Sequence, residues 1–290
     1  MNRSTLSTRV LVCIAATWFV WGSTYLVIRL ALVGFPPFFL MGTRFVVAGS
    51  LLMGYCLWRG SVLPTKRQWF SALVVGSLML GGGMGGTAYA ELTIGSGLVV
   101  AFIAITPLLI TLVHLPLGLR PRRLELAGIC LGVVGVLLLT RGATYQSSLG
   151  GLLAICLGCV GWTMGTVLSQ RSLRLAPGAM GFASEMLCGG LVLLCLSASV
   201  GEHWSLIVPQ GAWLAWGYLV VFGSLIAFNA YMYLLGKVSN GVATSYTYVN
   251  PVIALGLGVT VGHESISPSE WQAVAVILAG LILLLSGKRV

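Results

Sequence analysis

The chain has 290 residues, of which 58% are hydrophobic and only 8% are charged, and its mean hydropathy is +1.00. A soluble domain carries about 25% charged residues, so this composition excludes a soluble globular protein and indicates a protein embedded in a membrane. The excess of basic over acidic residues gives a net charge of +10. In a membrane protein such an excess sets the orientation across the bilayer, and we expect no nucleic-acid partner.

Apolar runs fill the chain from one end to the other. Ten of them, each about 17–25 residues long, can cross about 30 Å of hydrocarbon as helices. The runs are continuously apolar rather than alternating, which is typical of membrane helices and not of barrel strands. The sequence therefore predicts an all-α integral membrane protein with ten transmembrane helices, at residues 10–30, 38–58, 69–90, 95–118, 124–140, 150–170, 179–200, 212–235, 240–262 and 270–286.

The segments between these runs differ in charge. With the N-terminus in the cytoplasm, 13 of the 16 basic residues fall on cytoplasmic segments, for example in the loops 59–67, 119–123 and 171–174. Because basic residues are retained on the cytoplasmic side, both termini are predicted to be cytoplasmic. Glu91, Glu202, Glu264 and Glu270 then fall on the outer side. The first run is too long for the apolar region of a signal peptide, so we expect it to remain as the first helix.

The two halves of the chain share landmarks at a nearly constant spacing. This regularity predicts two domains, residues 1–145 and 146–290, each a five-helix repeat. Because five is odd, the second repeat enters the membrane from the opposite face, a design that places a transport site near the midplane between the repeats. The matched landmarks are Trp21 and Trp162, Arg44 and Glu185 (141 apart); Tyr89 and Tyr233, Gly97 and Gly241, Thr106-Pro107 and Asn250-Pro251 (144 apart); and Glu125 and Glu270, Gly135 and Gly280 (145 apart).

Three stretches carry a family resemblance: Trp21-Gly22-Ser23-Thr24-Tyr25, Gly223-Ser224 through Asn229-Ala230-Tyr231-Met232-Tyr233, and Ala243-Thr244-Ser245-Tyr246 with Tyr248-Val249-Asn250-Pro251. Together they resemble the EamA family of the drug/metabolite transporter superfamily, and within it the bacterial YedA-like branch. The resemblance covers both repeats. It implies a ten-helix carrier of the bacterial inner membrane with a central cavity, often an exporter of amino acids or related metabolites, and it implies no particular substrate.

The chain departs from the family at one motif. Members commonly carry Gly-Glu at the end of the fourth and ninth helices. Here Gly118 is followed by Leu119-Arg120, and Gly262-His263-Glu264 only approximates the pattern. A role of the fourth-helix acid therefore does not transfer to this chain.

Arg44 and Glu185 are the only charged side chains that we place well inside predicted helices. A charge at the centre of a membrane helix costs about 2.5–3.5 kcal/mol on insertion scales, so such residues usually face a cavity or a partner. Their matched positions in the repeats suggest an ion pair, which would either contact substrate or hold the two bundles in register. An unpaired Glu185 would suit proton coupling, whereas a paired one would stay ionised.

Polar and proline residues recur together in the fourth and ninth helices. Pro107 and Pro251 each remove a helical hydrogen bond, which predicts either a packing kink or a hinge. Tyr246 and Asn250 share one face of the ninth helix, and Thr106 is the counterpart of Asn250. A buried amide needs a partner, so we count Thr106, Tyr246 and Asn250 among the candidate substrate contacts.

Aromatic and glycine residues complete the candidate site. Trp21, Tyr25 and Trp162 lie inside their helices, where they either stack on a solute or simply pack. Asn229, from the stretch that resembles the family, is a further candidate substrate contact. Gly83, in the run Gly81-Gly82-Gly83, is a candidate hinge because glycine allows close helix approach and local unwinding.

These features favour a secondary transporter, and several alternatives stay open. No nucleotide-binding motif is present and the histidine and cysteine residues form no metal set, so we expect no cofactor, no metal and no enzymatic activity. The expected partners are a small-molecule substrate and the lipid bilayer, with a homodimer through the Gly128/Gly132 or Gly161/Gly165 notches as an open alternative. Amino acids are the first substrate prediction; amphipathic or cationic drugs, and lipid translocation, are the alternatives.

Overall fold

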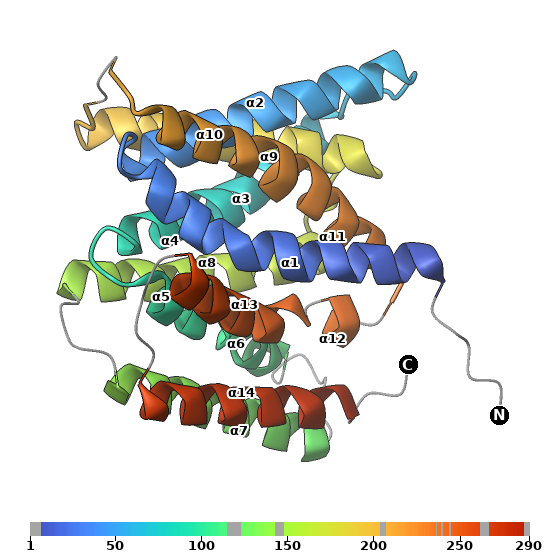
Figure 1. Cartoon of the computed structure of the whole chain (residues 1–290). Helices are drawn as coiled ribbons and strands as arrows, with labels where there is room; N and C mark the ends of the chain where they lie inside the picture. Colours follow the sequence, from blue (N-terminus) through green and yellow to red (C-terminus); the bar gives the residue numbers. More distant parts are fainter. Residues whose placement is uncertain are drawn as a thin grey trace, which may run out of the picture.

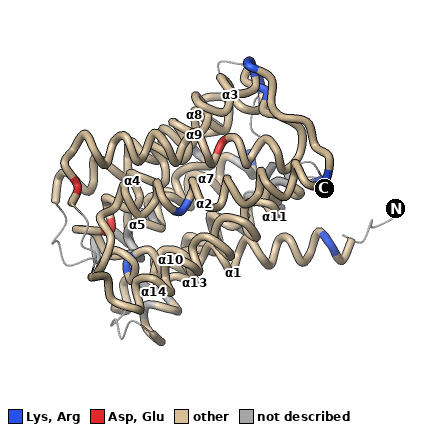
Figure 2. The backbone as a smooth tube through the Cα atoms, turned by 90° about the horizontal axis from the view of Figure 1, so that it is seen from above, with Lys and Arg blue, Asp and Glu red and all other residues tan. Residues whose placement is uncertain are grey.

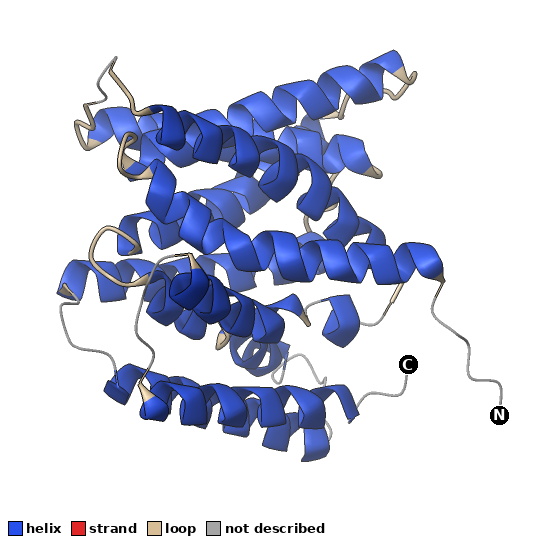
Figure 3. Ribbon diagram, in the orientation of Figure 1, coloured by secondary structure: helices blue, strands red, loops and turns tan. Residues whose placement is uncertain are grey.

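The computed structural model is a bundle of helices in which long helices cross at shallow and steep angles (Figure 1). It describes residues 7–114, 123–142, 148–203, 207–235, 237–238, 240–243, 245–261 and 267–286. Within these residues every regular element is a helix and no strand occurs (Figure 3). The predicted all-α membrane fold is therefore confirmed.

The helices of the first half are α1 (Thr8–Ala31), α2 (Pro37–Trp58), α3 (Lys66–Gly76), the π-helix η1 (Ser77–Met84), α4 (Gly85–Ala90), α5 (Ser96–Ile103), α6 (Thr106–His114) and α7 (Arg123–Gly142). Those of the second half are α8 (Leu149–Arg171), α9 (Ala179–Ser199), α10 (Gln210–Tyr218), the π-helix η3 (Leu219–Ile226), α11 (Ala227–Leu235), α12 (Asn240–Ala243), α13 (Tyr246–Thr260) and α14 (Pro268–Ser286). The predicted Gly118 and Gly262-His263-Glu264 motifs lie outside the described residues.

Length and composition identify membrane-crossing segments among the described helices. Six are long and apolar enough to span a bilayer: Thr8–Ala31, Pro37–Trp58, Lys66–Ala90, Leu149–Arg171, Ala179–Ser199 and Gln210–Tyr231. Leu126–Gly135 and Trp271–Gly280 are shorter apolar segments inside α7 and α14. Charged positions are few along the tube, and most lie near helix ends (Figure 2). The predicted number of ten crossings stays a prediction.

Polar side chains cap the N-termini of several of these helices. The Ser7 hydroxyl accepts from the Val10 N–H at the start of α1, and Thr65 and Gln68 form a capping box at the start of α3. The N-terminus of α2 is capped from a distant segment: the Glu202 carboxylate accepts from the Phe38 and Phe39 N–H groups, at 3.0 and 2.8 Å. This contact ties the loop after α9 to α2.

The helices α2 and α9 cross at very short range through glycines. A β-carbon on Gly49 would lie 2.9 Å from the Leu187 backbone nitrogen, with the Ala183 carbonyl equally close at 3.0 Å. A β-carbon on Gly190 would lie 2.8 Å from the Val46 nitrogen, with the carbonyl of Gly42 also at 3.0 Å. The two contacts are equivalent: adding 141 to Gly49, Val46 and Gly42 of α2 gives Gly190, Leu187 and Ala183 of α9. Each helix therefore places its glycine against the same positions of the other.

The pair α7 and α14, which lies side by side at one edge of the bundle, repeats this arrangement (Figure 1). A β-carbon on Gly135 would meet the Ile277 nitrogen at 2.8 Å, and one on Gly280 would meet the Gly132 nitrogen at 2.7 Å. Ile277 lies 145 residues after Gly132, the same spacing as between the two glycines. The Gly128/Gly132 notch is thus filled within the chain by Gly280, and Gly161 likewise faces the Leu78 carbonyl of η1.

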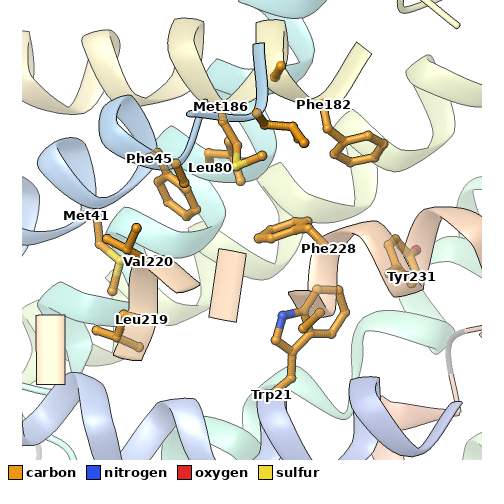
Figure 4. Packing of buried hydrophobic residues seen from close by; sticks show 14 of the residues in the cluster. Trp21, Met41, Phe45, Leu80, Phe182, Met186, Leu219, Val220, Phe228 and Tyr231 are labelled. Atoms are coloured by element: carbon orange, nitrogen blue, oxygen red, sulfur yellow. The ribbon is translucent and has the colours of Figure 1, made fainter. Parts of the chain in front are cut away.

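An apolar core joins α1, α2, α9 and η3. Phe45, Met41, Leu219 and Val220 pack together where α2 meets η3, and Trp21 packs under Phe228 (Figure 4). Large apolar side chains also point outward, such as Val12, Phe19, Leu157, Leu214 and Ile282, each more than 60% exposed. A surface this apolar fits a lipid environment.

Candidate functional site

Two π-helical segments interrupt otherwise α-helical spans. η1 follows α3 in the first half, and η3 follows α10 in the second half. Each has eight residues, and their starts at Ser77 and Leu219 are 142 apart, within the spacing of the predicted repeats. π-helical turns inside α-helices occur frequently at functional sites because they leave backbone groups without regular partners.

In both segments a side chain donates a hydrogen bond to a backbone carbonyl at the point where the π-helix passes into the α-helix. The Thr87 hydroxyl donates to the Gly83 carbonyl at 2.8 Å, and the Asn229 amide donates to the Leu225 carbonyl. Thr87 and Asn229 are again 142 residues apart. Asn229, predicted as a substrate contact, thus bonds its own helix in this structure.

The fourth and ninth apolar segments are each broken into two helices. The first break, at Ala104-Ile105, separates α5 from α6, and Pro107 follows it at the second position of α6. The second break, at Ser245, separates α12 from α13, and Pro251 lies six residues further on inside α13. α13 therefore continues through Pro251, and the interruption of this apolar segment lies six residues earlier; the kink or hinge at Pro251 stays a prediction.

Each break receives a hydrogen bond from the first helix of the other half. The Trp18 indole of α1 donates to the Ser245 hydroxyl at 2.9 Å, and the Cys159 thiol of α8 donates to the Phe102 carbonyl at 3.6 Å. Trp18 and Cys159 are 141 residues apart. The interrupted helices are thus supported by equivalent positions of α1 and α8.

A pocket lies where these interrupted helices meet α1 and α8. Its free volume is about 50 Å³, and its walls are aromatic, threonine, glycine and small apolar residues. Both halves contribute matching helices, namely the first, third and fourth of each. The lining residues are Trp21, Thr24, Tyr25, Gly83, Met84, Thr87, Ile103, Thr106, Gly158, Cys159, Trp162, Phe228, Tyr246 and Thr247.

Aromatic contacts fix the shape of this pocket. The Trp21 ring lies 4.5 Å from Tyr246 and 5.1 Å from Phe228 between ring centroids, both edge to face, and its indole donates to the Gly223 carbonyl at 3.1 Å. Trp162 packs over Gly83, where a β-carbon would lie 3.1 Å from its ring. Aromatic pairs of this geometry contribute about 0.5–1.5 kcal/mol beyond area burial, so these contacts stabilise the shape of the pocket.

The structure gathers half of the predicted site. Trp21, Tyr25, Gly83, Thr106, Trp162 and Tyr246 all line the pocket. Asn250, one turn beyond Tyr246, is 1% exposed, and its amide lies close to the Tyr25 hydroxyl. A polar neighbour of this kind offsets the cost of burying an amide. Arg44, Glu185, Asn229, Pro107 and Pro251 do not line the pocket.

The suggested ion pair between Arg44 and Glu185 is not formed. The Arg44 Nε donates to the Ser224 hydroxyl of η3 at 2.9 Å, and its Nη1 lies 3.6 Å from the Met41 sulfur. Its Nη2 and the Glu185 Oε1 are both buried without a partner in the part of the chain that the structure describes. Gly223 makes room for the guanidinium, since a β-carbon there would lie 2.8 Å from Nη2.

Several residues around the pocket were missed in the sequence. Thr87, Phe228 and Thr247 lie inside apolar runs without any charge to mark them. Glu91 directly follows α4 and is only 4% exposed, but it does not line the pocket.

Helices long enough to cross a bilayer surround an aromatic pocket in this chain, an arrangement that is typical of membrane transporters. The sequence profile of the EamA-like transporter family matches residues 8–141 and again residues 149–286. The chain therefore belongs to the EamA-like transporter family.

Individual relatives agree with this assignment. The inner membrane transporter YedA of Escherichia coli K12 is 39% identical over 274 residues, which cover 94% of this chain and 89% of YedA. An S-adenosylmethionine/S-adenosylhomocysteine transporter of Chlamydia trachomatis is 28% identical over 287 residues, covering 92% of this chain and 86% of that protein. A solved crystal structure with 22% identity has the same fold, with a TM-score of 0.73 over 98% of this chain and 100% of the other.

Proposed function

We propose that this protein is a secondary transporter that exports small organic metabolites, such as amino acids, across the inner membrane by alternating access. The observation that carries this proposal is the pocket, whose walls come from corresponding segments of both halves of the chain and include Trp21, Trp162 and Tyr246. Sites between two repeats are the general location of substrate binding in such carriers. The relatives are named as transporters, which supports a role without catalysis.

We propose that the fold comprises ten crossings in two inverted five-helix repeats, residues 1–145 and 146–290, with both termini in the cytoplasm. Support comes from the contacts of Gly49 and Gly190, and of Gly135 and Gly280, which are equivalent under exchange of the two halves. The family profile matches each half once. The cytoplasmic placement of the termini rests on the distribution of basic residues.

The interrupted helices supply hinges for alternating access in this proposal. Gly83 lies in η1 and in the pocket wall, and Pro107 follows the break between α5 and α6. Pro251 lies in the helix that presents Tyr246 and Asn250. Irregular backbone at these places allows one bundle to move against the other while the pocket stays between them.

The size of the pocket favours small solutes. A free volume of about 50 Å³ is well below the ~300–1,000 Å³ typical of sites for drug-sized ligands. The export of amphipathic or cationic drugs, the first alternative, would require a much wider state. The relative that transports S-adenosylmethionine carries a solute with an amino-acid group, which agrees with amino acids or their derivatives as the substrate class.

Lipid translocation is the second alternative, and one feature favours it. A separate apolar hollow of about 240 Å³ lies between α6 and α8, lined by Leu109, Leu112, Val113, Val160, Thr163 and Met164. Several of these side chains are exposed on the surface, so the hollow opens sideways. Its lining offers a single polar side chain, that of Thr163, for a headgroup.

Solute exchange in proteoliposomes tests the proposal. Liposomes loaded with a mixed pool of metabolites are sampled outside by mass spectrometry, with protein-free liposomes as the control. Selective movement of a few amino acids, reduced by Asn250→Leu, is the expected result. If reconstitution is verified and no small solute moves, while fluorescent lipids flip between leaflets, the carrier proposal fails and lipid translocation takes its place.

A further inference from the structure

Four aromatic rings pack together at one side of the pocket. The Trp21 ring lies 5.1 Å from Phe228 and 4.5 Å from Tyr246 between ring centroids. The Tyr231 ring lies 5.2 Å from Trp21 and 5.6 Å from Tyr246. Trp21, Phe228 and Tyr246 line the pocket and Tyr231 does not, so Tyr231 lies behind the wall that the other three rings form. All four side chains of this four-ring cluster are buried.

In the proposed topology the four-ring cluster lies on the cytoplasmic side of the pocket. Tyr231 is four residues before the end of α11 at Leu235, and Tyr246 is the first residue of α13. The segment between α11 and α12 carries the exposed Lys237, and basic segments are retained in the cytoplasm. A solute that passes between the pocket and the cytoplasm therefore has to pass these rings.

The start of α13 is bonded to the first helix of the other half. The Trp18 indole of α1 donates to the Ser245 hydroxyl at 2.9 Å, at the break that precedes α13, and Ser245 is buried. The next residue, Tyr246, packs on Trp21, which lies about one turn along α1 from Trp18. The Tyr246 hydroxyl also lies close to the Trp162 side chain of α8. The start of α13 can therefore leave α1 only if the hydrogen bond and the ring contact break together.

The corresponding place in the first half is held more weakly. At the break between α5 and α6, the Cys159 thiol of α8 donates to the Phe102 carbonyl at 3.6 Å. A thiol is a weak donor, whereas an indole N–H is an ordinary one. Phe102 is the counterpart of Tyr246 at the spacing of 144 residues. Its side chain is only half-buried, and among the described residues no aromatic ring packs on it.

We propose that the start of α13 is the cytoplasmic gate of the transport pathway, and that the Trp18–Ser245 hydrogen bond and the four-ring cluster keep it closed at rest. Alternating access opens the two sides of a site in turn, so the side with the stronger contacts is the one that is closed in the more populated state. This inference rests on the proposed carrier function and adds the resting conformation of its site, which is closed toward the cytoplasm and opens more readily to the outside.

Hydrogen exchange of the full-length protein in nanodiscs, read by mass spectrometry, measures how readily each segment opens. Trp18→Phe keeps an aromatic ring and removes the indole donor. It should speed exchange across α12 and the first half of α13 about fivefold, because an ordinary hydrogen bond shifts an equilibrium by about that factor. Exchange across α5 and α6 should stay unchanged. Cys159→Ala, the equivalent change in α8, should speed exchange across α5 and α6 by about twofold or less, because the bond that it removes is weak.

Trp216→Phe is the matched control. The Trp216 indole also donates to a hydroxyl, that of Thr43 at 3.2 Å, but this bond joins α10 to α2 and does not involve α13. Its loss should leave exchange across α12 and α13 unchanged. Unchanged exchange there in Trp18→Phe, or an equal rise in Trp216→Phe, would overturn the inference. Should Trp18→Phe fail to fold, Ser245→Ala removes the acceptor of the same bond and has to give the same rise.

The resting conformation is read from the native Cys159, which lines the pocket. A membrane-impermeant methanethiosulfonate reagent is added to right-side-out and to inverted membrane vesicles, and the modified peptide is identified by mass spectrometry. Cys159 is expected to react faster in right-side-out vesicles, and Trp18→Phe should raise its rate in inverted ones. Equal rates from the two sides, or a faster reaction in inverted vesicles of the unaltered protein, would contradict the proposed resting conformation.

Failure of this inference is distinguishable from failure of the carrier function. If the proteoliposomes move metabolites while Trp18→Phe exchanges hydrogen like the unaltered protein, the carrier proposal stands and the gate is wrong. If no metabolite moves, the carrier proposal falls and the gate falls with it, whatever the exchange of α13 shows.

Discussion

Arg44 has an unusual environment for a buried arginine. Its residue is fully buried, no carboxylate bonds it, and one hydroxyl, that of Ser224, accepts from Nε. The Met41 sulfur is a weak acceptor for Nη1, and Nη2 lies against the space above Gly223. Because the buried guanidinium has so few acceptors, each of them matters for the stability of the protein. In η3, Ser224 supplies one acceptor, and Gly223, which has no side chain, leaves room for the guanidinium.

Removal of the Ser224 hydroxyl should therefore destabilise the protein. In Ser224→Ala the buried Arg44 Nε loses its acceptor, and the expected loss is about 1–3 kcal/mol of unfolding free energy. Arg44→Met removes the charge while keeping the volume, so it should cost little by itself and should cancel the loss in the double variant. Thermal unfolding in nanodiscs measures all three. A double variant as unstable as Ser224→Ala would contradict the assigned role of the contact.

For single residues, the sequence predicted many of the side chains that line the pocket but few of the contacts that they make. Trp21, Tyr25, Trp162 and Tyr246 could be predicted because aromatic residues deep in apolar runs are conspicuous. The Arg44–Ser224 contact could not, since the 180 residues between them leave no local pattern. The charge symmetry of Arg44 and Glu185 suggested an ion pair, yet matched positions in two repeats need not face each other.

Among the helix crossings, the glycine contacts of α2 and α9 make a matched pair of tests. Gly49→Ala and Gly190→Ala each place a methyl group within 3.0 Å of backbone atoms of the facing helix, so the helices must separate. Each should lose about 1–3 kcal/mol of stability, as overpacked cores do, and the two losses should be similar because their surroundings are equivalent. The melting temperature in nanodiscs reports the change.

Gly54→Ala on the same helix is the control, because nothing lies within 4 Å of a β-carbon there. Alanine is the better helix former, so this variant should be neutral or slightly stabilised. A loss for Gly54→Ala equal to that at Gly49 would show that the effect comes from the helix itself and not from the crossing.

The π-helical segments allow a test of movement. Thr87→Val and Asn229→Leu remove the side-chain donors to the Gly83 and Leu225 carbonyls with little change in volume. Each lost hydrogen bond contributes about 1 kcal/mol. If the bond is present in only one of two conformations, its loss changes the equilibrium constant between them about fivefold. We expect solute exchange in proteoliposomes to change by about this factor in both variants. Ser77→Ala, which removes an exposed hydroxyl at the start of η1, should leave the rate unchanged.

Elements were predicted unevenly for a physical reason. Apolar length indicates that a segment crosses the membrane, so α1, α2, α8 and α9 follow directly from their runs. The π-helical turns and the breaks at Ala104-Ile105 and Ser245 could not be located, because their backbone geometry depends on side chains of other helices. The Ser245 break, for example, is held by the Trp18 indole from α1.

For the molecule as a whole, the number of crossings decides which face of the membrane each loop meets. Ten crossings place the loop at residue 120 in the cytoplasm and residue 264 outside. Six crossings, made by the helices long enough to span, place them the other way round. The two arrangements agree for residue 61, in the cytoplasm, and for residue 202, outside. Residues 120 and 264 are thus the informative positions.

Alkaline phosphatase fused after these four residues gives the answer, because the enzyme is active only outside the cytoplasm. We expect activity after residues 202 and 264 and none after 61 and 120, since Arg120, Arg122 and Arg123 favour retention of their loop in the cytoplasm. Activity after 120 together with its absence after 264 would refute the ten crossings. Both arrangements give each half an odd number of crossings, five or three, so the two halves have opposite orientations in either case and the fusions decide the number of crossings alone.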